Sequence, residues 1–287
     1  MNPRFISLAT LSFILLGGCA GPGTPAAPPI AEQRSHEVAA PHGAVRIDEY
    51  YWLRDDERKD PAMLAYLEAE NAYADAVLAP LASLRKRLFD ELVGRIKQDD
   101  ATVPYREGDY FYYTRFEEGG EYPIHARRKG DMDAEEEILL DVNEMARGHA
   151  FFQVANLSVS PDQQQLAYLV DTVGRRQFSL HVKDLETGEV RDTGVAGVSY
   201  SLVWANDNRT IFYVWNDPGT LLTKRVKAHR LGTEPAEDRL IYEEPDDSFY
   251  IGVDATQSKK YVCIELSSTV SNEQRCADRD DPTEFRI

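Results

Sequence analysis

The serine, histidine and acidic residues are the side chains here that could support hydrolysis of an acyl bond. Such chemistry needs an activated nucleophile, a base and oxyanion donors together. In one large class of hydrolases the nucleophilic serine lies in a Gly-x-Ser-x-Gly turn between a strand and a helix. The 287 residues contain no such motif, and the nearest segment, Gly197-Val198-Ser199-Tyr200-Ser201, lacks the final glycine. We interpret that segment as an ordinary turn, so the sequence predicts no catalytic residue.

The histidines do not form a metal-binding pattern. The six of them show no paired spacing like that of zinc ligands on a helix, and they stand at positions 36, 42, 125, 149, 181 and 229. No glycine-rich phosphate loop follows a strand-like run either. We therefore expect no metal and no cofactor. His181 and His229 lie in strand-like patterns, where we expect a solvent-facing or hydrogen-bonded side chain.

Cys263 and Cys276 could form a disulfide. They are 13 residues apart around Thr269-Val270-Ser271-Asn272, which is compatible with two facing positions of a hairpin. An oxidising compartment would favour the bond. Because strand register cannot be derived from sequence, two independent cysteines remain the alternative.

Cys19 closes an export signal. Arg4 precedes an apolar run from Phe5 to Leu16 that is too short to span a bilayer as a helix. The run ends in Leu16-Gly17-Gly18-Cys19, which resembles a bacterial lipobox, so residues 1–18 are predicted to be a lipoprotein signal peptide and Cys19 the lipidated residue. Residues 19–34 are rich in proline and predict an extended tether. Ala20 favours the outer membrane, so we expect a lipid-anchored protein that faces the periplasm.

The composition is that of a globular and acidic protein. Hydrophobic residues make up 43% of the chain, and 49 Asp and Glu outnumber 32 Lys and Arg, which gives a formal net charge of −17. No basic cluster would follow a phosphate backbone, so nucleic acid is excluded as an expected partner. The acidic charge either favours cationic peptides or only keeps the protein soluble.

Residues 35–97 predict an extended and helical arm with two helices. Asp60 before Pro61 is a typical helix start, because the aspartate caps free N–H groups and proline needs none in the first turn. This helix runs towards Leu78, with an apolar stripe at Tyr66, Tyr73 and Val77. Pro80 then marks a break. In the second helix one face is apolar, and it comprises Leu81, Leu84, Leu88, Leu92 and Ile96. We interpret both stripes as packing surfaces.

Residues 98–287 predict a mainly β domain with an internal repeat. Four short aromatic and β-branched runs read as strands, and they begin at Tyr110, Leu166, Ile211 and Tyr261. Val159-Ser-Pro-Asp162 precedes the second run and matches Trp204-Ala-Asn-Asp207 before the third, 45 residues later; Asp254-Ala-Thr-Gln257 precedes the fourth.

This period favours a partial β-propeller with about three to four blades visible, with a plain antiparallel sandwich as the competing architecture. Strand-like runs from Phe178 and Val226 predict outer hairpins. Propellers have four to eight blades, so an array of this size would leave sheet faces uncovered.

The ordered motifs over residues 40 to 276 resemble the N-terminal part of oligopeptidase B and other prolyl oligopeptidase relatives. They are Pro41-His42-Gly43, Asp48-Glu-Tyr-Tyr-Trp-Leu-Arg-Asp-Asp56, Tyr66-Leu-Glu-Ala-Glu-Asn71, Glu121-Tyr122, Asp141-Val-Asn143, Ser160-Pro-Asp162, Arg175-Arg-Gln177, Val203-Trp-Ala-Asn-Asp207 and Leu240-Ile-Tyr-Glu-Glu244. The resemblance implies a propeller that caps an α/β-hydrolase domain with a Ser, Asp and His triad. It also implies cleavage of short peptides after Arg or Lys, since the propeller excludes large folded proteins.

The triad of that family maps onto no position of this chain, which we therefore expect to be inactive by itself. The first hypothesis is the propeller part of a serine oligopeptidase that works with a hydrolase domain. The alternative is a non-catalytic, lipid-anchored propeller that binds a peptide or protein partner. The acidic clusters, such as Asp99-Asp100, Glu135-Glu136-Glu137 and Asp246-Asp247, are interpreted as solvated loops and not as binding residues.

Overall fold

A computed structural model describes residues 27–287, which divide into two compact units at Ile96 and Lys97. The predicted signal peptide and Cys19 lie outside the described residues. Within residues 27–287 there is no helix with the length and apolar character needed to cross a membrane.

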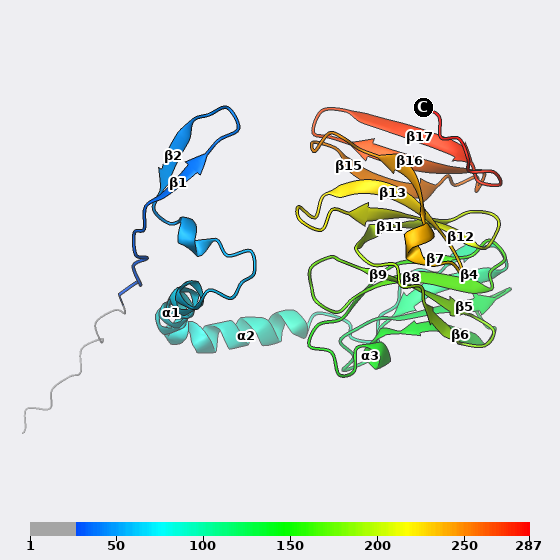
Figure 1. Cartoon of the computed structure of the whole chain (residues 1–287). Helices are drawn as coiled ribbons and strands as arrows, with labels where there is room; N and C mark the ends of the chain where they lie inside the picture. The colour runs from blue at the N-terminus through cyan, green and yellow to red at the C-terminus, as the bar shows by residue number, and fades with distance from the viewer. Residues whose placement is uncertain (1–26) are drawn as a thin grey trace, which may run out of the picture. The chain divides into compact units, whose positions relative to one another are not determined.

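The first unit consists of a hairpin followed by helices (Figure 1). Strands β1 (His36–Ala39) and β2 (Val45–Asp48) pair in antiparallel fashion, and a short 3-10 turn, η1 (Tyr51–Leu53), follows. Helix α1 (Pro61–Leu78) comes next, and η2 (Ala79–Leu81) then separates it from α2 (Ala82–Val93). Both helices were expected from the sequence and are confirmed, and η2 lies at the break predicted at Pro80.

Helix α1 begins where the sequence indicated. The Asp60 carboxylate accepts hydrogen bonds from the N–H groups of Ala62 and Met63, at 2.8 and 2.9 Å. Tyr66 and Tyr73 are half-buried, but Val77 is exposed, so only part of the expected stripe packs. The apolar face of α2 is exposed along its whole length, from Leu84 at 40% to Leu92 at 63%.

The second unit is a series of four antiparallel sheets, which we call blades (Figure 1). In each blade the strands pair in chain order. Blade 1 contains β3 (Tyr105–Glu107), β4 (Tyr110–Arg115), β5 (Ile124–Lys129) and β6 (Glu136–Asp141), followed by the short helix α3 (Val142–Met145). Blade 2 contains β7 (Gln153–Val159), β8 (Gln165–Asp171), β9 (Ser179–Asp184) and β10 (Val190–Asp192).

Blade 3 contains β11 (Val198–Trp204), β12 (Thr210–Asn216), β13 (Thr223–Arg230) and β14 (Arg239–Glu243), with the 3-10 turn η3 (Pro235–Glu237) before β14. Blade 4 contains β15 (Tyr250–Ala255), β16 (Tyr261–Ser267) and β17 (Asn272–Asp278). A bridge between Cys276 and Arg286 adds one residue pair outside β17. The predicted partial propeller is confirmed, and the sandwich alternative is not.

The strand-like runs of the sequence are the second strands of the four blades. Each follows a tight turn that contains one residue with positive φ: Gly108, Gln163, Asn208 and Lys259, at 59, 64, 55 and 60°. Val159 and Trp204 end equivalent first strands, as the repeat indicated. In blade 4 the equivalent residue is Ala255, so the matching segment begins one residue later than Asp254, where the sequence comparison placed it.

Apolar side chains fill the spaces between successive blades. Along β8, Leu166 and Tyr168 pack with blade 1, whereas Ala167 and Leu169 pack with blade 3. These four residues are at most 2% exposed. Because neighbouring side chains of a strand point to opposite faces, one short run of apolar residues packs into the interfaces on both sides of blade 2.

Polar side chains add bonds across the same interfaces. The indole N–H of Trp204 donates to the carbonyl oxygen of Ser158 at 2.9 Å, which joins blade 3 to blade 2. The buried Arg127 of blade 1 donates to the carbonyl oxygen of Gln163 at 2.9 Å. Such bonds satisfy polar groups that packing removes from water.

A buried polar network lies inside blade 3. Asp238 accepts from the Tyr213 hydroxyl at 2.7 Å and lies 2.7 Å from Nδ1 of His229. Burial, with this hydrogen bond to Asp238, raises the pKa of the Tyr213 hydroxyl far above its ordinary value. The sequence predicted that His229 is either solvent-facing or hydrogen-bonded, and the structure shows that it is hydrogen-bonded. His181 is partly buried and stacks on Tyr168.

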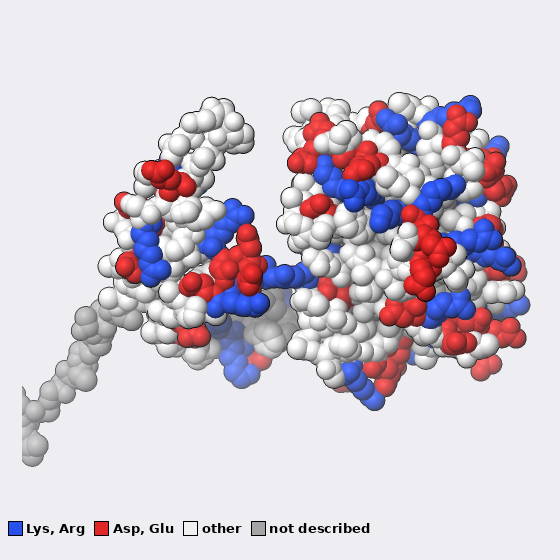
Figure 2. Space-filling model, viewed as in Figure 1, with Lys and Arg blue, Asp and Glu red and all other residues white. Residues whose placement is uncertain are grey.

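Charged residues of both signs are interspersed over the faces seen in Figure 2. The acidic clusters noted in the sequence are largely paired: Glu136 with Arg115, Glu137 with Arg127, and Asp247 with Lys224. Their main role is local ion pairing, which is consistent with the interpretation that they are not binding residues.

We predict that Leu169→Ala destabilises the chain because it empties a fully buried site between blades 2 and 3. The free energy of unfolding should fall by about 2–5 kcal/mol, measured by urea denaturation. The matched control is Leu240→Ala on β14, where the side chain is 50% exposed, and its effect should stay within about 0.5 kcal/mol. Equal losses from the two substitutions would contradict the packing described.

Candidate functional site: a polar funnel

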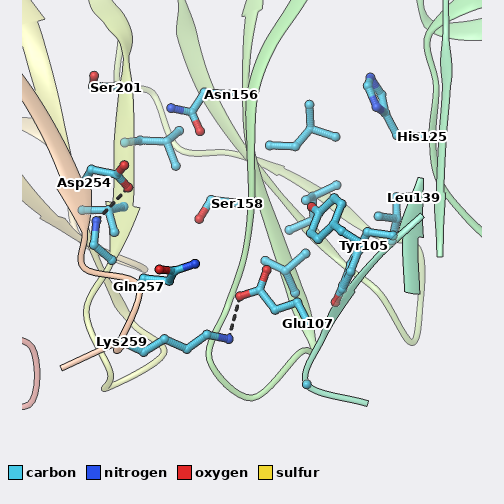
Figure 3. A pocket seen from close by; sticks show the side chains of 18 of the residues that line it. Tyr105, Glu107, His125, Leu139, Asn156, Ser158, Ser201, Asp254, Gln257 and Lys259 are labelled. Atoms are coloured by element: carbon cyan, nitrogen blue, oxygen red, sulfur yellow. Dashed lines mark hydrogen bonds and ion pairs between the residues drawn. The ribbon is translucent and has the colours of Figure 1, made fainter. Parts of the chain in front are cut away.

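A funnel of about 1080 Å³ opens along the first strands of the four blades (Figure 3). Strands β3, β7, β11 and β15 line it, and each is the terminal strand of its sheet. The labelled side chains that project towards the open space are mostly polar, and they include Glu107, Asn156, Ser158, Ser201 and Lys259. The funnel is therefore a hydrophilic passage within the second unit.

Irregular first strands set the direction of several lining residues. The pairing of β7 with β8 shifts register between Ala155 and Ser158, and Asn156 has a φ of 42°. Its amide donates to the carbonyl oxygen of Tyr200 in blade 3 at 2.6 Å. A β-bulge re-aims a side chain in this way. Counted from the turns, Ser201 and Gly252 occupy the equivalent positions in blades 3 and 4, and both line the funnel.

An ion pair crosses from blade 4 to blade 1 at the end of the funnel where the tight turns lie. Nζ of Lys259 is 2.7 Å from Oε1 of Glu107 (Figure 3). Both side chains are about half exposed, so the pair is worth at most about 1 kcal/mol. Its significance is its position, because it joins the first blade to the fourth across the passage.

Arg279 lies deeper beside this ion pair. It is 7% exposed and donates from Nε to the carbonyl oxygen of Trp204 at 2.8 Å. Burial lowers the pKa of its guanidinium, although the charges of Glu107 and Asp254 oppose that shift. The funnel thus contains one buried cation among several carboxylates.

Two further side chains of the funnel wall are at least partly buried. Tyr112 is 5% exposed, and its hydroxyl has no hydrogen-bond partner among the described residues. His125 lies 3.0 Å from the Thr114 hydroxyl through Nδ1, and burial lowers the pKa of its imidazole below the usual value. His125 therefore stays neutral at neutral pH.

The funnel contains no group of side chains suited to covalent catalysis. Ser199, in the segment nearest to a nucleophile turn, lies in β11 at an irregularity between Val198 and Leu202. In residues 27–287 no cluster of three or more His, Cys, Asp or Glu side chains is arranged to hold a metal ion. What the funnel can do is admit and orient a polar ligand.

Sequence reasoning did not identify the funnel residues. A usable signal existed, because in blades 2, 3 and 4 the position three residues before the end of the first strand carries Asn156, Ser201 and Gly252. Reading that signal requires knowing that the first strand is the innermost one and that it is irregular in blades 2 and 3. Neither follows from the pattern of apolar residues.

Cys263 and Cys276 are joined by a disulfide across β16 and β17. Both backbone groups of Cys276 bond to Arg286 on the opposite side, so the two cysteines form a non-hydrogen-bonded pair, the closer type of antiparallel pair. On the same face, Glu265 accepts a hydrogen bond from Gln274 at 3.1 Å. This face of blade 4 points away from blade 3.

A series of antiparallel sheets around a polar passage, three of them with four strands and one with three, defines a propeller-type domain. The chain belongs to the prolyl oligopeptidase family, since residues 29–286 match its N-terminal β-propeller domain.

The chain is similar to several named peptidases. It is 48% identical to dipeptidyl aminopeptidase BI of Pseudoxanthomonas mexicana over the whole chain and 34% identical to protease 2 of Moraxella lacunata over 88% of it. The solved structure of oligopeptidase B from Leishmania major matches 91% of the chain with a TM-score of 0.83 and 30% identity. The chain spans only 42%, 37% and 39% of these three proteins.

We predict that Cys263 and Cys276 react with a maleimide only after reduction, with the labelled peptides mapped by mass spectrometry. Replacing both cysteines by alanine should lower the free energy of unfolding by about 3 kcal/mol. The disulfide joins two residues that are 13 positions apart, so it closes a loop of that length in the unfolded chain. Full labelling of the native protein without reductant would exclude the bond.

Proposed function

We propose that this chain supplies the propeller of a serine-type oligopeptidase, in which short peptides reach a separate catalytic domain through the funnel. Cleavage after Arg or Lys is part of the proposal. The observation that carries it is the polar funnel between the first strands, in a chain that belongs to the prolyl oligopeptidase family.

The funnel suits an extended, cationic peptide for two reasons. Each first strand is an edge strand, and the open side of such a strand offers backbone groups to an extended chain. The wall also presents the carboxylates of Asp254 and Glu265, besides that of Glu107, which is paired with Lys259. With a net charge of −17, the chain attracts basic peptides over a longer range, most strongly at low salt.

An uncovered apolar surface supports the presence of a separate catalytic domain. Leu88, Phe89 and Leu92 of α2 are 48%, 66% and 63% exposed, and large exposed apolar patches mark interaction surfaces. The relatives extend well beyond the part that this chain matches. We infer that the stripe on α2 packs against a hydrolase domain of the kind that the family resemblance implies.

Reconstitution tests this function directly. The 287-residue chain should be produced together with the remainder of dipeptidyl aminopeptidase BI, the part that this chain does not match. We expect the mixture to cleave a short peptide after its Arg residue, while neither part does so alone and a folded protein is left intact. Activity of the remainder alone on both short peptides and folded proteins would contradict a role for this propeller in admitting substrate.

Matched substrates and variants sharpen that test. A peptide with a free amino terminus and its acetylated form separate removal of N-terminal dipeptides from internal cleavage. Leu88→Glu and Leu92→Glu should abolish assembly with the hydrolase part, whereas Val173→Glu, at a residue 69% exposed in blade 2, should not. Assembly unaffected by the α2 substitutions would overturn the proposed interface.

The location of the protein forms a second part of the proposal. The run from Phe5 to Leu16 followed by Gly17-Gly18-Cys19 supports export and lipidation of Cys19, and Ala20 supports the outer membrane, facing the periplasm. We predict that the chain fractionates with outer membranes after density separation. Cys19→Ser should release it into the periplasmic fraction, whereas Cys19→Ser protein that remains in the membrane would contradict lipid anchoring.

A further inference from the structure

Three arginines without partners line a cavity between blades 2 and 3. The cavity has a volume of about 490 Å³. Arg191 comes from β10, Arg209 from the turn before β12, and Arg230 from the end of β13. Over residues 27–287, none of these three guanidinium groups has an ion pair or a hydrogen bond. We call this the arginine cavity.

The two carboxylates that line the arginine cavity, Asp162 and Asp207, accept hydrogen bonds within their own turns. Asp207 accepts from the N–H groups of Arg209 and Thr210, at 2.9 and 2.8 Å, and from the Thr210 hydroxyl at 2.7 Å. Asp162 accepts from the Ser160 hydroxyl and from the N–H of Gln164. Three cations therefore face two carboxylates whose hydrogen-bonding capacity is largely used.

Electrostatics agree with this geometry. Burial alone would raise the pKa of Asp207, but the hydrogen bonds from Arg209 and Thr210, together with the charge of Arg230, lower it. Asp207 is thus ionised at neutral pH, and Arg230 acts on it at a distance without pairing with it. The cavity keeps an excess of positive charge in a chain whose net charge is −17.

The backbone that carries these arginines is held rigidly. Asn208, which has positive φ, accepts from the N–H of Asp162 at 3.0 Å, and its carbonyl oxygen accepts from the Gln165 amide at 3.2 Å. These bonds join the turns of blades 2 and 3 at the base of the cavity. Arg230 lies directly opposite Thr210 in the register of β12 and β13.

We propose that the arginine cavity is a binding site for an oxyanion of phosphate type. A guanidinium presents a planar fork of donors that matches phosphate oxygens in a bidentate manner. The volume falls in the range of small-ligand pockets. Both a free phosphate compound and the phosphate of a lipid headgroup have this chemistry, and the site is independent of the funnel and of peptide cleavage.

The first experiment measures binding of inorganic pyrophosphate by titration calorimetry in low-salt buffer without phosphate. We expect binding that weakens with added salt. Arg209→Gln and Arg230→Gln should each weaken it about tenfold, which is the loss of one charge-assisted interaction. The control is Arg175→Gln. Arg175 is exposed and follows the end of strand β8 that is opposite to the cavity residue Gln165. A seven-residue strand spans about 20 Å, so this substitution should leave binding unchanged.

The second experiment identifies the source of the anion. The Cys19→Ser chain, which lacks the predicted anchor, is mixed with vesicles of phosphatidylcholine, with or without phosphatidylglycerol. Binding that requires phosphatidylglycerol and is lost in Arg230→Gln assigns a lipid headgroup, whereas binding of pyrophosphate alone assigns a free phosphate compound. Binding of neither probe by the chain, or equal weakening by Arg175→Gln, would overturn the proposal.

Discussion

The apolar packing between successive blades is the constraint on which the rest of the second unit depends. A blade such as β7 to β10 has buried side chains on both faces, so it cannot be stable without a neighbour on each side. Leu166 and Tyr168 belong to one interface, and Ala167 and Leu169 belong to the next. The burial of Arg127 at the first interface and the position of each inner strand follow from this stacking.

The funnel is a consequence of the same packing. Each first strand is an edge strand of its sheet, and its unpaired edge faces open space. Irregularities in the first strands of blades 2 and 3 release Asn156 and Ser201 from the regular alternation of side chains.

Blade 4 departs from this scheme on the face that points away from blade 3. The positions equivalent to Ala167 and Leu169 of blade 2 are Cys263 and Glu265, and a disulfide with a glutamate–glutamine hydrogen bond replaces an apolar pair. A covalent link between β16 and β17 holds their register without help from packing on that face. The arginine cavity is a second departure, because cations there remain unpaired in an acidic chain.

The sequence by itself determined the helices, the repeat and the family. The cap at Asp60, the apolar second strands and the turn motifs are local signals, because each depends on neighbours within a few residues. The absence of a nucleophile turn was equally readable, as was the spacing of Cys263 and Cys276.

Only the tertiary structure decided which residues meet across blades. The burial of Arg127 and Arg279, the network of Tyr213, His229 and Asp238, the pairing of the two cysteines and the makeup of the funnel depend on strand register and on bulges. A shift of one residue in a strand sends every side chain to the opposite face, and the local pattern does not determine that shift.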